Sequence, residues 1–77
     1  MAAMNEMQGV RLLRRRQVEE MVGLRRSALY ALVAAGKFPR PIHLTVRAVA
    51  WLSSEVDRWI AERVVESRQG SVVDAKP

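Results

Sequence analysis

Two prolines in the middle of the chain, Pro39 and Pro41, constrain its fold more than any other feature. Proline lacks a backbone N–H and disfavours the α conformation at the residue before it. The segment from Phe38 to Pro41 must therefore be extended and cannot be helical. The sequence is interpreted as two parts, one on each side of this segment.

Two short helices are predicted before the prolines. Val18, Met21 and Val22 repeat at i, i+3 and i+4, which indicates a helix from Arg15 to Val22. Gly23 follows at the position where a left-handed residue commonly ends a helix. Leu12-Leu13, ahead of this helix, is either a brief strand or an apolar anchor.

The second helix is predicted from Arg26 to Ala35 and ends at Gly36. Its apolar face carries Ala28, Leu29, Leu32 and Val33. The opposite face carries Ser27, Tyr30, Ala31 and Ala34, with Arg26 at its margin. These outer side chains are small or can form hydrogen bonds, so the helix could approach a partner closely.

A hairpin and a third helix are predicted after the prolines. Ile42 and Leu44 alternate with His43 and Thr45 before a turn at Val46-Arg47, and Val49 and Trp51 alternate with two alanines after it. This predicts a hairpin over residues 40–51, and the absence of glycine at the turn leaves the strand register open. Ser54 and Asp57 resemble a capping box. They would open a helix whose apolar stripe is Val56, Trp59, Ile60 and Val64. We assign Trp51 and Trp59 to the core rather than to base stacking.

The predicted organisation is one small domain over residues 11–68, between a flexible segment 1–10 and a disordered polar tail 69–77. Positive charge is concentrated in residues 11–47, which hold nine basic and two acidic residues. A surface that meets a polyanion has this character, and so does a solvated basic face.

Two short helices joined by a tight turn, with Arg, Ser and Tyr outward on the second, have the build of a helix-turn-helix. The predicted fold is mainly α with a small β-hairpin, a winged helix-turn-helix of three helices plus a wing. The helix 26–35 would enter the major groove of double-stranded DNA. The basic hairpin 40–51 would lie beside the DNA backbone or reach the minor groove.

The order of short motifs along the chain supports this interpretation. They are Gly23-Leu24, Ser27 to Tyr30, Gly36 to Pro39, Pro41 to Leu44, Val49 to Trp51, Ser54 to Val56 and Trp59-Ile60. From Leu12 to about Val64 the chain resembles the AlpA-like prophage regulators, a family close in fold to phage excisionases and MerR-type activators. The resemblance implies a bacterial, cytoplasmic and nucleoid-associated transcriptional regulator that binds DNA.

The chain departs from this family's pattern at the start of the second helix. The family commonly has Ser and Thr where this chain has Arg25 and Ala28. Arg25 cannot cap the helix as Ser would, and it adds a positive charge beside the expected phosphates.

Arg26, Ser27 and Tyr30 are the candidate base-contacting residues, because the first turn of a recognition helix points into the groove. The alternatives are an exposed arginine and a helix cap for the first two, and a half-buried phenol between helices for Tyr30. The candidate phosphate contacts, which confer affinity without sequence preference, are Arg14, Arg15, Arg16, Arg25, Lys37, Arg40 and Arg47.

Catalysis is not expected, because no nucleophile, acid–base pair or phosphate-binding loop is recognisable. His43 is the only histidine and cysteine is absent, so we expect no metal and no cofactor. No apolar stretch approaches the ~20 residues that span a bilayer, and we expect no membrane or small-molecule partner. The alternatives are an excisionase-like architectural factor and a protein-interaction module that inhibits a regulator or recombinase. Without heptads for a coiled coil, we expect a monomer that loads cooperatively with further copies on DNA.

Overall fold

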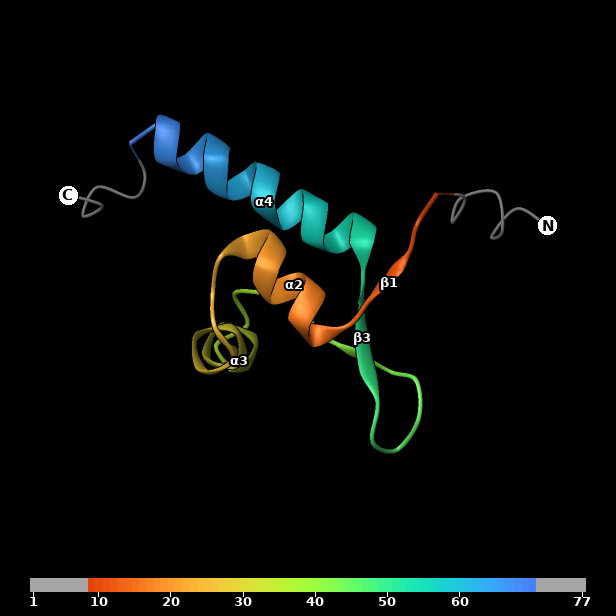
Figure 1. Cartoon of the computed structure of the whole chain (residues 1–77). Helices are drawn as coiled ribbons and strands as arrows, with labels where there is room; N and C mark the ends of the chain where they lie inside the picture. The colour runs from red at the N-terminus through yellow and green to blue at the C-terminus, as the bar shows by residue number, and fades with distance from the viewer. Residues whose placement is uncertain (1–8, 71–77) are drawn as a thin grey trace.

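The computed structural model describes residues 9–70 (Figure 1). Its elements in chain order are β1 (Leu12–Leu13), α2 (Arg15–Val22), α3 (Arg26–Ala34), β2 (Ile42–His43), β3 (Val49–Leu52) and α4 (Ser53–Arg68). Helices thus dominate this part of the chain beside a small antiparallel sheet, which confirms the predicted fold class. The predictions of a flexible segment over residues 1–10 and a disordered tail over residues 69–77 fall outside the described residues, except for residues 9–10 and 69–70.

The sheet is built around β3, which pairs antiparallel with β1 on one side and β2 on the other. Leu13 lies opposite Trp51, and Ile42 lies opposite Ala50. Leu12-Leu13 is therefore a strand, which decides between the two alternatives left open by the sequence. The pairing fastens the segment before α2 to the centre of the sheet.

The turn of the hairpin is one residue longer than predicted. The N–H groups of Leu44 and Thr45 both donate to the Ala48 carbonyl, at 2.8 and 3.2 Å, so the loop is residues 45–47 rather than a two-residue turn. The Thr45 hydroxyl oxygen accepts the N–H groups of Arg47 and Ala48 at 3.3 and 3.1 Å. These side-chain bonds replace the glycine that such a loop commonly uses.

Helix α4 begins two residues earlier than the predicted capping box requires. Ser53 is its first residue, Leu52 occupies the N-cap position without a side-chain cap, and Ser54 is already helical. Ser53 instead bonds to Arg11: its N–H donates to the Arg11 carbonyl and its Oγ accepts the Arg11 N–H, both at 2.7 Å. The capping-box prediction was wrong because β3 passes into α4 without a linker.

Two glycines in left-handed conformation end the helices of the helix-turn-helix. Gly23 has a φ of 74° directly after α2, and Gly36 has the same φ shortly after α3. The Lys37 N–H donates to the Leu32 carbonyl at 2.8 Å and the Gly36 N–H to the Val33 carbonyl at 3.0 Å, which is the Schellman arrangement. Helix α3 therefore ends at Ala34 rather than at the predicted residue 35.

The buried core draws on both halves of the chain. Its fully or nearly fully buried side chains are Leu13, Val18, Leu29, Phe38, Trp51 and Val56. Phe38 comes from the proline segment, which periodicity could not assign to the core. Ala28, which was predicted on the apolar face of α3, is exposed, and Ala50 is buried together with Trp51.

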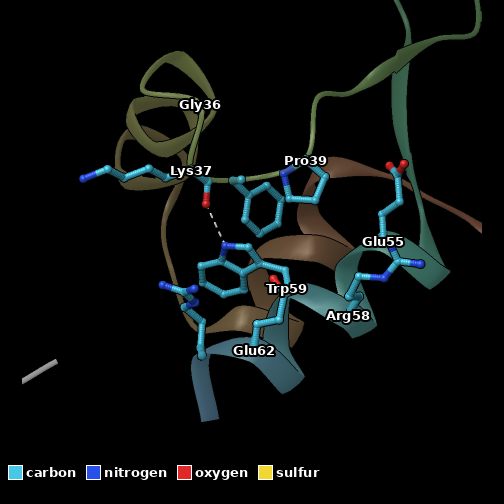
Figure 2. A pocket seen from close by; sticks show the side chains of 9 residues that line it. Gly36, Lys37, Pro39, Glu55, Arg58, Trp59 and Glu62 are labelled. Carbon is cyan, nitrogen blue, oxygen red and sulfur yellow. Dashed lines mark hydrogen bonds between the residues drawn. The ribbon is translucent and has the colours of Figure 1, made fainter. Parts of the chain in front are cut away.

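Both tryptophan indoles anchor the proline segment. The Nε1–H of Trp51 donates to the Pro39 carbonyl at 2.8 Å, and that of Trp59 donates to the Lys37 carbonyl at 2.7 Å (Figure 2). The Phe38 and Trp59 rings meet edge to face with centroids 4.8 Å apart. Trp51 is fully buried, as predicted, whereas Trp59 is half-buried at the margin of the core.

Candidate nucleic-acid interface

A basic hollow lies where the start of α2, the first turns of α3 and the hairpin meet. It has a volume of about 410 Å³ and is lined by Arg14, Arg15, Arg16, Arg26, Tyr30, Arg47 and Val49. We call it the arginine hollow. Six of the ten predicted site residues line it, although they come from three separate stretches of sequence.

Arg14 links helix α2 to the sheet at the edge of this hollow. Its backbone N–H donates to the Gln17 Oε1 at 2.8 Å, which satisfies a free donor at the start of α2. Its side-chain Nε donates to the Val49 carbonyl at 3.1 Å. The Arg14 guanidinium is thus held between the helix and the hairpin, an arrangement that the sequence did not indicate.

Arg15 has a carboxylate partner within its own helix. Its guanidinium forms an ion pair with Glu19, one turn later, and the two side chains are only 30% and 20% exposed. The i,i+4 spacing is a known signal for such pairs, and it could have identified Glu19 from the sequence. Arg15 therefore brings less uncompensated charge to the hollow than its neighbours do.

Tyr30 packs against the sheet at the edge of the arginine hollow. It is half-buried, and its ring lies 6.2 Å from that of Trp51, centroid to centroid, at an interplanar angle of 58°. It also lines the hollow. The phenol is therefore half-buried, as one alternative had it, but against Trp51 of β3 rather than between helices.

The arginine hollow concentrates positive charge. Five arginines line it and none of its lining residues is acidic, so Glu19 of the Arg15 pair is the compensating carboxylate that the contacts show. Like charges gathered in a concave surface attract anions from solution.

Four predicted site residues lie outside the hollow. Arg25 occupies the N-cap of α3 without a side-chain hydrogen bond, as expected for an arginine there, and Ser27 and Arg40 are exposed. Lys37 lines a separate groove of about 650 Å³ between the proline segment and α4, which includes Trp59 and Glu62 (Figure 2). The outer face of α3 is as predicted in part: Ser27, Ala31 and Ala34 are exposed.

Residues 11–64, which contain the sheet, the helix-turn-helix and most of α4, match the family model described as Prophage CP4-57 regulatory protein (AlpA). The chain belongs to the AlpA family. All the lining residues of the arginine hollow lie within the matched range. AlpA is a family of regulatory proteins, not of enzymes, and the resemblance inferred from the motif order is confirmed.

Two relatives extend this comparison. The chain is 42% identical over 60 residues to "Uncharacterized protein ORF88" of Enterobacteria phage P4, covering 78% of this chain and 68% of that protein. It is 30% identical over 66 residues to "DNA-binding transcriptional activator AlpA" of Escherichia coli (strain K12), covering 78% of this chain and 94% of that protein. The second match spans nearly the whole of a small AlpA protein, so the shared unit is the domain seen in this structure.

Between residues 9 and 70, no group of three or more His, Cys, Asp or Glu side chains could hold a metal ion. Among the helices of the same region, none is both long and apolar enough to cross a membrane.

Proposed function

We propose that this chain is a sequence-specific double-stranded DNA-binding protein that acts as a prophage transcriptional regulator in the bacterial cytoplasm, at the nucleoid. Helix α3 enters the major groove, and the hairpin of β2 and β3 serves as the wing. The observation that carries the proposal is the arginine hollow, which gathers five guanidinium groups from three elements. The E. coli relative, which is described as a DNA-binding transcriptional activator, supports it.

Duplex DNA suits this surface better than a small anion does. A phosphate lies every ~1.7 Å along the duplex axis, so a row of arginines can each meet one. Apart from Arg26, the exposed side chains of α3 are a hydroxyl and methyl groups, at Ser27, Ala28, Ala31 and Ala34. Such a face allows the helix backbone close to base edges.

The proposal assigns different roles to the basic residues. Arg26 opens α3 and lines the hollow, and with Ser27 and Tyr30 it contacts base edges. Within the hollow the phosphate contacts are Arg14, Arg16 and Arg47, and Arg15 joins them only when its ion pair with Glu19 opens. Around the hollow they are Arg25, Lys37 and Arg40. One reading helix with one wing buries only ~600 to 1,000 Å², so we propose that several copies bind neighbouring sites cooperatively.

Footprinting tests this proposal directly. The purified protein is titrated on the DNA upstream of its own gene and on the neighbouring attachment site, with Arg26→Ala and Arg68→Ala as variants. Arg68 is exposed in the last turn of α4, outside the hollow, and provides the charge-matched control. The parent is expected to protect a defined site. Arg26→Ala should weaken binding to that site by ~1 to 3 kcal/mol, roughly 5- to 150-fold, and should relax sequence preference at one or two base pairs.

The outcomes separate the competing functions. An equal loss for Arg26→Ala on all sequences would make Arg26 a phosphate contact rather than a base contact. Absence of binding to any duplex at low salt would refute DNA binding and favour a protein-interaction module.

A further inference from the structure

The tip of the wing carries an aliphatic side chain that has no role in the fold. Val46 is 95% exposed, whereas the next most exposed large apolar side chain of residues 9–70, Val65, is 51% exposed. Loop tips favour Gly, Asn, Asp and Ser, because these residues suit turn conformations. A β-branched apolar residue held in water at such a tip requires another explanation.

The Val46 side chain is presented on a rigid support. The Thr45 Oγ1 accepts two backbone N–H groups of the loop, from Arg47 and Ala48. Strand β3 behind the loop is the central strand of the sheet, and its Trp51 is fully buried. The tip is therefore preorganised, and inserting it into a partner would cost little conformational entropy.

The tip also lies beside the surface proposed to meet DNA. Arg47, the next residue, lines the arginine hollow together with Arg14 and Arg26. The hairpin loop projects away from the three helices (Figure 1). If the hollow holds phosphates and α3 occupies the major groove, the tip reaches across the backbone towards the adjoining minor groove.

We infer that Val46 is an apolar wedge that enters the minor groove and kinks the bound duplex, an inference that rests on the proposed DNA-binding function. Proteins that bend DNA through the minor groove insert apolar side chains at a base step and partly unstack it. Ile42 in β2 and Leu44 just after it are 37% and 43% exposed, so the segment that leads to the tip presents further apolar side chains to a partner. The wing thus reads DNA by its deformability as well as by charge.

The base step under the wing decides specificity at a position that α3 does not contact. Pyrimidine–purine steps such as TpA unstack easily, whereas A-tracts are stiff. The protein should therefore bind a site with TpA under the wing more tightly than the same site with an A-tract there. Val46→Ser should remove most of this preference.

A bending assay on a single footprinted site provides the test. A short duplex with a donor and an acceptor dye at its ends reports the bend by energy transfer, with Val46→Ser, Val65→Ser and the parent compared at saturation. Val65 is the matched control, an exposed valine on α4, and surface substitutions of this kind leave stability nearly unchanged. We expect the parent to bend the site by at least ~20°. Val46→Ser should lose most of that bend and bind about tenfold more weakly, on the scale of leaving two methyl groups unburied, whereas Val65→Ser behaves as the parent does.

Each contrary result has a distinct meaning. A parent-like bend and parent-like TpA preference in Val46→Ser would overturn the wedge and leave DNA binding intact. If Val46→Ser bends a single site as the parent does but loses cooperativity on two adjacent sites, the wedge is also overturned. That result would place Val46 against a second copy of the chain. Failure of the parent to bind any duplex would refute the proposed function and the wedge with it.

Discussion

The ion pair between Arg15 and Glu19 makes a quantitative prediction about salt dependence. Each phosphate neutralised on duplex DNA contributes about −0.9 to the slope of log affinity against log salt. Five arginines line the hollow, and Arg15 is the one whose guanidinium is already paired. Glu19→Gln keeps the shape of the side chain and removes its charge, so it should release Arg15 to a phosphate and steepen the slope.

The expected magnitudes follow from these counts. Arg26 is assigned to base edges and Arg15 is paired, so the phosphate contacts of the hollow are Arg14, Arg16 and Arg47. They contribute a slope of about −2.7, and affinity falls roughly 40-fold between about 50 and 200 mM salt. With Arg15 released the slope becomes about −3.6 and the fall roughly 150-fold. Arg47→Ala should reduce the slope to about −1.8 and the fall to roughly 12-fold. Basic residues outside the hollow add the same amount to the slopes of the parent, Glu19→Gln and Arg47→Ala. The differences between these slopes are therefore the quantities to compare.

The assay is fluorescence anisotropy of a labelled duplex titrated at several potassium chloride concentrations. Arg68→Ala, which removes a charge far along α4, should leave the slope unchanged. Thermal unfolding, monitored by circular dichroism, checks that Glu19→Gln is folded. It should be, since a helix ion pair of this kind contributes only ~0.3 to 0.5 kcal/mol to the free energy of unfolding. Equal slopes for Glu19→Gln and the parent would refute the claim that Glu19 keeps Arg15 from the DNA. Equal slopes for Arg47→Ala and the parent would show that the hollow does not contact phosphates.

Three further predictions concern the fold that supports the hollow. Trp51→Ala should be unfolded by circular dichroism at room temperature, because truncating a buried indole costs ~3 to 5 kcal/mol, which is about all the stability of a core this small; a cooperative parent-like melt would contradict this. Trp59→Phe should remain folded but lose the hydrogen bond to the Lys37 carbonyl, and urea unfolding should show a loss of ~1 kcal/mol; a loss above ~3 kcal/mol would contradict the marginal position of the ring. Gly23→Ala should destabilise by ~1 to 2 kcal/mol from its left-handed backbone alone, because an added Cβ would meet no atom within 4 Å; an unchanged melting temperature would contradict this.

Local patterns predicted the helices well. The bounds of α2 agree with the prediction at both ends, and those of α3 differ by one residue. The i, i+3, i+4 spacing and the two left-handed glycines suffice because a helix satisfies its hydrogen bonds within its own segment. The same holds for the concentration of positive charge in residues 11–47, which is a property of the sequence itself.

Non-local features were predicted less well. The hairpin register was left open, and the N-cap of α4 was placed two residues late, at Ser54 instead of Leu52. The core role of Phe38 was not predicted at all. In each case the deciding contact joins residues far apart in sequence: Ser53 bonds to Arg11, and the Trp51 indole bonds to Pro39. No periodicity within a short window contains these pairs.

The candidate site shows the same division. The sequence by itself determined the basic residue types, their concentration before residue 48 and the small outer face of the second helix, because these depend only on composition and helical spacing. Only the tertiary structure decided that Arg14, Arg26 and Arg47 share one hollow, that Arg15 is paired with Glu19, and that Val46 stands alone at the wing tip. Pairing of β1 and β2 with β3 sets these positions, and the burial of Trp51 and Phe38 holds them. Such placement depends on how the whole core packs, since a shift of one residue in a strand moves every side chain to the other face.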